Sequence, residues 1–115
     1  LWTRIVFSIA VSNTDDHLRN HGFLLTNSGW TLSPVYDINP DPQGFGLSLN
    51  ITEADNSLDF SLAMEIAPIF RLKTNEARDI ASRVRSVVST WRTYAKYAGI
   101  GPAEQNQMQN AFRLE

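Results

Sequence analysis

Apolar and polar residues follow a helical spacing at both ends of the chain and a different pattern between them. The spacing predicts a helix over residues 1–11, and helical periodicity returns from residue 59. Between these regions, the apolar runs Phe23–Leu25 and Trp30–Leu32 flank Thr26-Asn27-Ser28-Gly29, a sequence typical of a tight turn. The pattern therefore predicts one β-hairpin between helical segments.

The second half of the chain predicts three helices. The first begins at Asp59 and ends or kinks at Pro68, because proline cannot donate a backbone hydrogen bond. Thr74 is the expected N-cap of the longest helix, whose apolar stripe continues up to an expected stop at Gly99. Such a stripe is typical of a helix packed on a core rather than of a partner-binding face. A last short helix starts at Pro102.

The middle of the chain is less regular. Prolines interrupt residues 33–42, while the alternation of apolar residues over 47–51 permits a short strand. Together the elements predict a mainly α fold with a small β-hairpin (α+β). We expect a single domain over residues 1–115, with loops and hairpin in 1–58 and the helical part in 59–115.

Composition and charge narrow the class of protein. The 115 residues include no cysteine and 43% hydrophobic residues, which fits one globular domain with an ordinary apolar core and excludes a disulfide scaffold. No apolar run approaches the roughly 20 residues that span a bilayer. The formal net charge of −2 argues against nucleic-acid binding through bulk electrostatics. We expect no direct contact with nucleic acid or membrane, and the absence of cysteine is compatible with the expected cytoplasmic location.

Charge is unevenly distributed along the chain. Residues 1–70 carry two basic and eight acidic residues, net −6, whereas residues 71–96 carry seven basic and two acidic residues, net +5. The acidic first part is the better candidate for metal chemistry, and the basic part is typical of a solvated helix face.

The segment from Asn13 to Asn20 carries the most specific chemistry. Asp15 precedes Asn20 by five positions, the spacing of the catalytic aspartate and the metal-binding asparagine in a kinase catalytic loop, whereas Asp16 precedes it by four. Phosphoryl transfer uses such a carboxylate to position the attacking hydroxyl and an amide oxygen to hold Mg²⁺. Asp37 follows the predicted hairpin, which returns the chain close to the loop and so places a second metal-binding acid there.

The same residues have plainer interpretations. Asn13 and Asp15 can cap a helix end, Asp16 can be a solvated loop acid, and Asn20 can be a turn residue. His17 lacks a second histidine or cysteine at ligand spacing, which argues against zinc.

Other site classes lack support. The run Asp37, Asn39, Asp41 fits the first ligand positions of a calcium loop, but Pro42 stands at the required glycine and Ser48 at the bidentate acid. The sequence contains no P-loop, nucleophile elbow or zincin motif.

Two motifs resemble one protein family. Residues 13–20 read N-T-D-D-H-L-R-N and residues 32–38 read L-S-P-V-Y-D-I. Together they resemble the C-terminal lobe of HipA-like serine/threonine protein kinases, the toxins of bacterial toxin–antitoxin modules. The resemblance covers most of the chain. It implies a protein-kinase-like C-terminal lobe, ATP and Mg²⁺ as cofactors, and growth arrest or persistence through inhibition of translation. The implied partners are a protein substrate with a Ser or Thr acceptor and a DNA-binding HipB-type antitoxin.

The resemblance also implies a role for each residue. Asp15 would be the catalytic base. Asn20 and Asp37 would bind the cofactor as Mg²⁺ ligands, and Arg19 would lie beside the nucleotide phosphates. His17 belongs to the motif and is assigned to cofactor binding without a fixed role.

Three further expectations and alternatives follow. A kinase also needs a Gly-rich loop and a strand lysine paired with a helix glutamate. The chain begins at Leu1 without methionine, so we expect a fragment that lacks the N-lobe with these parts and is inactive alone. A lipid or small-molecule kinase lobe is an alternative, although Asn13 stands where aminoglycoside-type phosphotransferases usually place histidine. Another alternative is a non-catalytic interaction module, in which the basic helix over residues 75–98 docks an antitoxin or an acidic partner.

Overall fold

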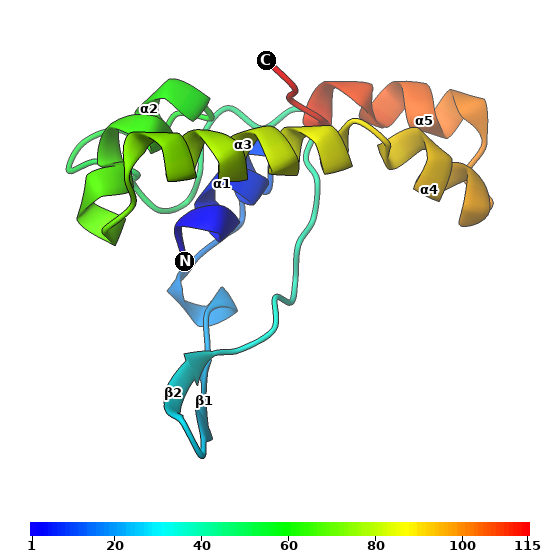
Figure 1. Cartoon of the computed structure of the whole chain (residues 1–115). Coiled ribbons are helices and arrows are strands. Elements are labelled where there is room, and N and C mark those ends of the chain that lie inside the picture. The colour runs from blue at the N-terminus through cyan, green and yellow to red at the C-terminus, as the bar shows by residue number, and fades with distance from the viewer.

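Helix α1 lies inside the helical body, against α2 and α3, and the chain leaves it to form a hairpin that projects from that body (Figure 1). The computed structural model describes all residues 1–115. It confirms a mainly helical fold with one two-stranded antiparallel hairpin. The elements, in order, are α1 (Trp2–Ala10), η1 (Leu18–Asn20), β1 (Phe23–Thr26), β2 (Gly29–Leu32), α2 (Phe60–Ile66), η2 (Ala67–Phe70), α3 (Thr74–Val88), α4 (Trp91–Tyr97), α5 (Pro102–Met108) and η3 (Gln109–Ala111).

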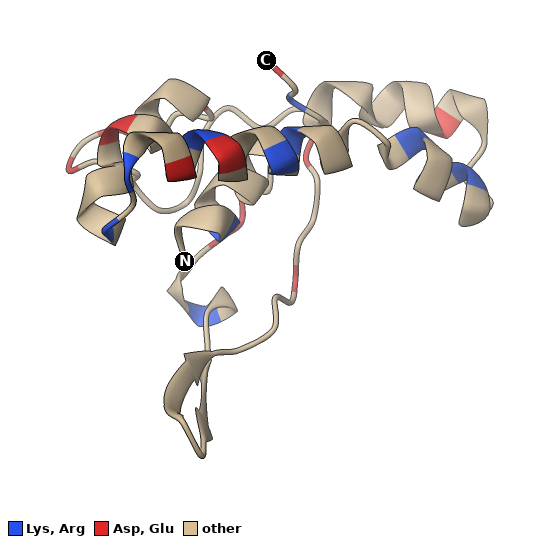
Figure 2. Cartoon of the chain, in the orientation of Figure 1, with Lys and Arg blue, Asp and Glu red and all other residues tan.

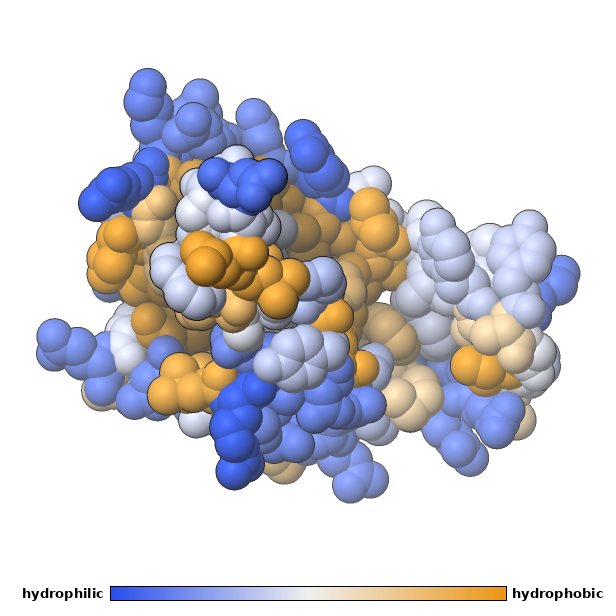
Figure 3. All heavy atoms as spheres, turned by 90° about the horizontal axis from the view of Figure 1, so that it is seen from below, coloured by the Kyte–Doolittle hydropathy of each residue, from blue (hydrophilic) through white to orange (hydrophobic).

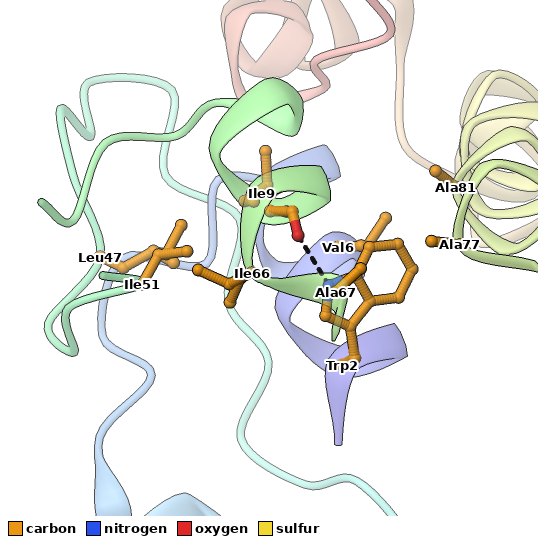
Figure 4. Close-up of a cluster of buried hydrophobic side chains, with 10 residues drawn as sticks. Trp2, Val6, Ile9, Leu47, Ile51, Ile66, Ala67, Ala77 and Ala81 are labelled. Atoms are coloured by element: carbon orange, nitrogen blue, oxygen red, sulfur yellow. Dashed lines mark hydrogen bonds between the residues drawn. The ribbon is translucent and has the colours of Figure 1, made fainter. Parts of the chain in front are cut away.

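The main core forms where α1 meets α2 and α3. Val6 and Ile9 of α1 are fully buried, and burial of each such side chain contributes about 1.5–3 kcal/mol. Trp2 is 2% exposed, and its indole N–H donates to the carbonyl of Ala63 at 2.8 Å (Figure 4). Small residues on the facing side of α3, such as Ala77, allow the helices to approach closely. The core therefore fixes α1, whose C-terminal end leads into the candidate loop.

The predicted hairpin is confirmed, and it stands apart from the core. Phe23 pairs with Leu32 and Thr26 with Gly29, so Asn27-Ser28 forms the turn. Phe23 is 62% exposed and Trp30 71% exposed, and viewed from below the molecule shows apolar surface in the middle of this face (Figure 3). The radius of gyration is 14.9 Å, against about 13 Å for a compact domain of this length. The projecting hairpin contributes to this difference.

The charged residues avoid the hairpin. Figure 2 shows Lys, Arg, Asp and Glu along α3, with none on β1 or β2. The apolar stripe of α3 faces the core through Ala77, Ala81 and Val88, as expected. Val87, by contrast, is exposed.

A second, smaller apolar cluster forms where the ends of α1 and α3 meet the C-terminal segment. Val11 and Val88 are buried there, and the rings of Trp91 and Phe112 stack with their centroids 4.1 Å apart. The side chain of Arg113 donates to the hydroxyl of Ser12 at 3.1 Å, which ties the C-terminal segment to the end of α1.

Three sequence predictions about the elements are wrong. The expected strand over 47–51 is absent, because the backbone N–H groups of Leu47 and Ile51 bond to a nearby turn, at the carbonyls of Asn56 and Asp55. Only an isolated bridge between residues 46 and 57 occurs beside them.

The other two errors concern the long helix. Lys73, not Thr74, is its N-cap, and the Lys73 N–H donates to the Glu76 carboxylate at 2.8 Å. The helix also ends at Val88 instead of continuing to Gly99. The hydroxyls of Ser89 and Thr90 donate to carbonyls three residues back, both at 2.7 Å, and so compete for helical acceptors.

The remaining helix boundaries agree with expectation. Asp59 caps α2 by accepting from the Ser61 N–H at 2.7 Å, and Pro68 lies in the 3₁₀ turn that ends α2. Gly99 has a φ of 80° just after α4, and α5 begins at Pro102. None of the helices has the length and apolar character needed to cross a bilayer.

Candidate active site

The candidate loop begins where α1 ends. Ser12 has a φ of 50°, a left-handed conformation that turns the chain out of the helix, and the N–H of Asn13 bonds to the carbonyl of Ser8 at 2.8 Å. Short polar residues are tolerated at such a turn, because their side chains bond to nearby groups. The loop therefore leaves the buried helix at a fixed angle.

Asp15 is the exposed acid of this loop. Its carboxylate makes no hydrogen bond or ion pair with another residue of the chain. A general base must have its acceptor oxygens free to meet a substrate proton. Asp15 meets this requirement, whereas its neighbour Asp16 is buried.

Asn20 and Asp37 are brought together across the hairpin. Asn20 is buried at the end of η1, and its Nδ2 donates to Oδ2 of Asp37 at 3.0 Å. Oδ1 of Asp37 accepts from Nδ2 of Asn39, also at 3.0 Å. The hydroxyl of Tyr36 donates to the carbonyl of Arg19 at 2.7 Å and so joins the two segments beside this pair. The hairpin thus returns the chain as the sequence pattern predicts.

Asp37 adopts an uncommon backbone conformation. Its φ of 57° lies in the left-handed region, which costs a residue with a side chain about 1–2 kcal/mol. Residues held in such conformations cluster at functional sites, where the surrounding contacts compensate for the strain. Here the amides of Asn20 and Asn39 provide those contacts.

The Asn20–Asp37 pair suits Mg²⁺ in its donor chemistry. Carboxylate and amide oxygens are ligands that Mg²⁺ prefers, and its sites commonly use one or two protein ligands together with phosphate oxygens. Oδ1 of Asn20 accepts from the His17 N–H at 3.0 Å, so the amide would turn by 180° to present this oxygen beside Asp37. No group of three or more His, Cys, Asp and Glu side chains is placed to hold a metal by itself.

One comparison with known proteins identifies the family. The model of the HipA-like C-terminal domain matches residues 1–91. The chain belongs to the HipA-like C-terminal domain family. The matched region includes α1, the candidate loop, the hairpin and α3. Neither the curated proteins nor the solved structures gave a significant match.

His17 and Arg19 lie together in this HipA-like domain. Nη2 of Arg19 is 3.4 Å from Nε2 of His17, and Arg19 is exposed. Nδ1 of His17 is buried and has no hydrogen-bond partner. The structure therefore places the two residues side by side on the loop that carries Asp15.

Asp16 has a structural role that sequence reasoning missed. The interpretation as a solvated loop acid is wrong: Asp16 is 9% exposed, and its Oδ1 is 2.8 Å from Nε2 of His21. Its Oδ2 accepts from the hydroxyl of Ser8 at 3.2 Å. The sequence did contain a signal for this contact, since Ser8 is a polar residue in the strongly apolar run 5–11.

Asn13 likewise does more than terminate a helix. It is 2% exposed, and its Oδ1 accepts from the backbone N–H of Asn39 at 3.2 Å. A cavity of about 230 Å³ opens beside it, lined among others by Arg4, Ser8 and Tyr36. The polar residues around the candidate loop thus connect α1 with the segment that carries Asp37.

Proposed function

We propose that this HipA-like domain is the phosphotransfer lobe of an ATP-dependent serine/threonine protein kinase. The observation that carries the proposal is the contact of Asn20 with Asp37. Asn20 lies five positions after the exposed Asp15. This arrangement combines a free carboxylate with a neighbouring carboxylate and an amide that, once turned, can supply two hard oxygen ligands, the combination that phosphoryl transfer needs. Family membership supports the same conclusion.

In this proposal each residue has a distinct task. Asp15 orients the substrate hydroxyl and accepts its proton as the hydroxyl oxygen bonds to the γ-phosphorus and the bond to ADP breaks. Asn20 and Asp37 would hold Mg²⁺, whose positive charge would stabilise the negative charge on the phosphate oxygens. Arg19 binds the nucleotide phosphates, and His17 orients the loop through its contact with Arg19.

The remaining parts of the proposal follow from the family resemblance. The substrate is a cytoplasmic protein with a Ser or Thr acceptor, and a HipB-type antitoxin is the regulatory partner. A Gly-rich loop and a strand lysine are also needed to hold the phosphates, so we expect activity from the full-length polypeptide that contains this domain and none from the 115 residues alone.

The test is a phosphorylation assay on that full-length protein. Asp15→Asn and Asp37→Asn should each reduce transfer of the γ-phosphate by at least 100-fold, in line with the loss of a catalytic base or metal ligand. The matched control is Asp59→Asn, which should retain the parental activity, because Asp59 is an exposed acid that caps α2 and asparagine fills this capping position equally well. If Asp15→Asn retains full activity, the assignment of the base is wrong. A full-length protein that neither binds Mg²⁺–ATP nor transfers phosphate would favour the interaction-module alternative.

A further inference from the structure

The carboxylate of Asp37 lies at one end of a continuous series of hydrogen bonds. Its Oδ1 accepts from the Asn39 side chain at 3.0 Å, and the Asn39 backbone N–H donates to Oδ1 of Asn13 at 3.2 Å. Nδ2 of Asn13 in turn donates to the hydroxyl oxygen of Ser8 at 3.4 Å. The series therefore runs from the exposed site back to the buried helix α1.

The other end of the series is the buried carboxylate of Asp16. Ser8 donates its hydroxyl proton to Oδ2 of Asp16 at 3.2 Å, and Oδ1 of Asp16 is held by His21 at 2.8 Å. Ser8, Asn13 and Asp16 are 3%, 2% and 9% exposed. Leaving a buried polar group unpaired costs free energy, so each of these side chains keeps its hydrogen-bond partners. Each bond therefore restricts the orientation of the next residue in the series.

The direction of each bond follows from the chemistry of Asp16. An ionised carboxylate only accepts hydrogen bonds, so the Ser8 hydroxyl must donate to it. The Ser8 oxygen is then left to accept, and it receives the Nδ2 group of Asn13. This leaves Oδ1 of Asn13 as the acceptor for Asn39. The Asn39 N–H can only donate, so both ends of the series require the same amide orientation of Asn13, and Asn13 fixes the backbone from which Asn39 reaches Asp37.

We infer that Ser8, Asn13 and Asn39 are positioning residues that orient the Asp37 carboxylate, with Asp16 as the buried anchor of the series. The inference rests on the proposed function, because the orientation matters only if Asp37 binds a cation. Residues that hold a metal ligand from behind typically contribute 10- to 100-fold to metal affinity. Loss of one bond in the series should therefore weaken the cation site without removing a ligand.

The test measures cation binding directly. Mn²⁺ is titrated into the full-length protein in the presence of a non-hydrolysable ATP analogue, and free Mn²⁺ is followed by electron paramagnetic resonance. Asn39→Ala and Ser8→Ala should each weaken Mn²⁺ binding by about 10-fold. Asn39 is exposed and keeps its backbone N–H when truncated, so Asn39→Ala provides the result even if Ser8→Ala perturbs folding.

Two matched controls separate positioning from a general loss of structure. Ser57→Ala removes a hydroxyl that donates to the carboxylate of Asp55, and Asn50→Ala removes an exposed loop amide that donates to the carbonyl of Glu53. Neither residue belongs to the series, so both controls should bind Mn²⁺ within twofold of the parent. The thermal unfolding midpoint of Asn39→Ala should stay close to that of Asn50→Ala.

The reference variant Asp37→Ala makes the outcomes distinguishable. If Asp37→Ala abolishes Mn²⁺ binding while Asn39→Ala and Ser8→Ala bind as the parent does, the inference is overturned and the proposed function stands. If Asp37→Ala itself binds Mn²⁺ normally, the cation site is assigned wrongly, and both the inference and the proposed function are contradicted. Weakened binding in Asn39→Ala and Ser8→Ala, with both controls unchanged, supports the inference.

Discussion

The carbonyl oxygen of Thr14 accepts two hydrogen bonds from Ser48, one from its backbone N–H at 3.0 Å and one from its hydroxyl at 2.6 Å. The Thr14 hydroxyl donates to Oδ2 of Asp41 at 3.2 Å. A loop that is distant in sequence therefore fixes the backbone directly before Asp15. The position of the candidate base depends on this loop as well as on α1.

Gly44 is expected to be sensitive to substitution because of this packing. A Cβ at residue 44 would overlap the methyl group of Thr14, and the backbone N–H and carbonyl of Gly44 are both hydrogen-bonded, to Asp41 and Arg113. Gly44→Ala should lower the free energy of unfolding by about 1–3 kcal/mol. Urea unfolding measures this change. Gly101→Ala is the control, because a Cβ there meets no atom within 4 Å. Equal free energies of unfolding for the two variants would show that the Thr14 side chain moves aside without a measurable loss of stability.

The left-handed backbone of Asp37 gives a second prediction. Asp37→Gly and Asp37→Ala both lose the carboxylate and its two amide contacts, but only alanine carries a Cβ at a φ of 57°. Asp37→Gly should therefore be more stable than Asp37→Ala by roughly 1 kcal/mol. Chemical denaturation of the two variants side by side tests this difference. A more stable alanine variant would contradict the backbone conformation.

Arg71 offers a substitution that should stabilise the fold. It is an exposed residue with a φ of 60° at the end of η2, where helices commonly place glycine. Arg71→Gly should raise the free energy of unfolding by about 1 kcal/mol. Lys73→Gly, at a φ of −75°, should bring no such gain. The prediction fails if the two substitutions change the denaturation midpoint equally.

Asp55 should show a measurable pH effect. The hydroxyl and then the backbone N–H of Ser57 donate to its carboxylate and hold the pKa of Asp55 below its usual value. The ionised form is thus favoured in the folded state, so the stabilisation is present above the unfolded pKa and is lost as the pH falls through the folded pKa. In an NMR titration, Ser57→Ala should move the pKa of Asp55 upward. An unchanged pKa would rule out the hydroxyl as the main cause.

Local pattern predicted the elements whose cause is local. The turn residues around Asn27 and the prolines after β2 act within a few positions, and the hairpin forms where they predict. The break after Val88 escaped prediction because the apolar stripe runs on through it, while the hydroxyls of Ser89 and Thr90 decide the local backbone. The expected strand near Leu47 failed because strand pairing needs a partner, which an alternating pattern does not specify.

The candidate site divides in the same way. Spacing and order were enough to single out Asn20 and Asp37, which the structure brings into contact; the roles of these residues stay predictions. Asp16 was misjudged, because its burial depends on Ser8 from α1 and on His21 beyond the loop. Contacts of this kind depend on how the helix and the loop meet in space, and one sequence does not state that.

The hairpin also limits the distance by which Asn20 and Asp37 can separate. The two residues are 17 positions apart, and closing a free loop of that length costs about 2.5 kcal/mol in chain entropy. Pairing of β1 with β2 shortens the unpaired tether to residues 21–22 and 33–36, which lowers this cost by about 1 kcal/mol. Both faces of the hairpin are largely exposed, and an isolated two-stranded hairpin is only marginally stable. A substitution of Gly29 that weakens the hairpin would therefore lengthen the free chain between Asn20 and Asp37. The entropic cost of bringing the two residues together would then rise.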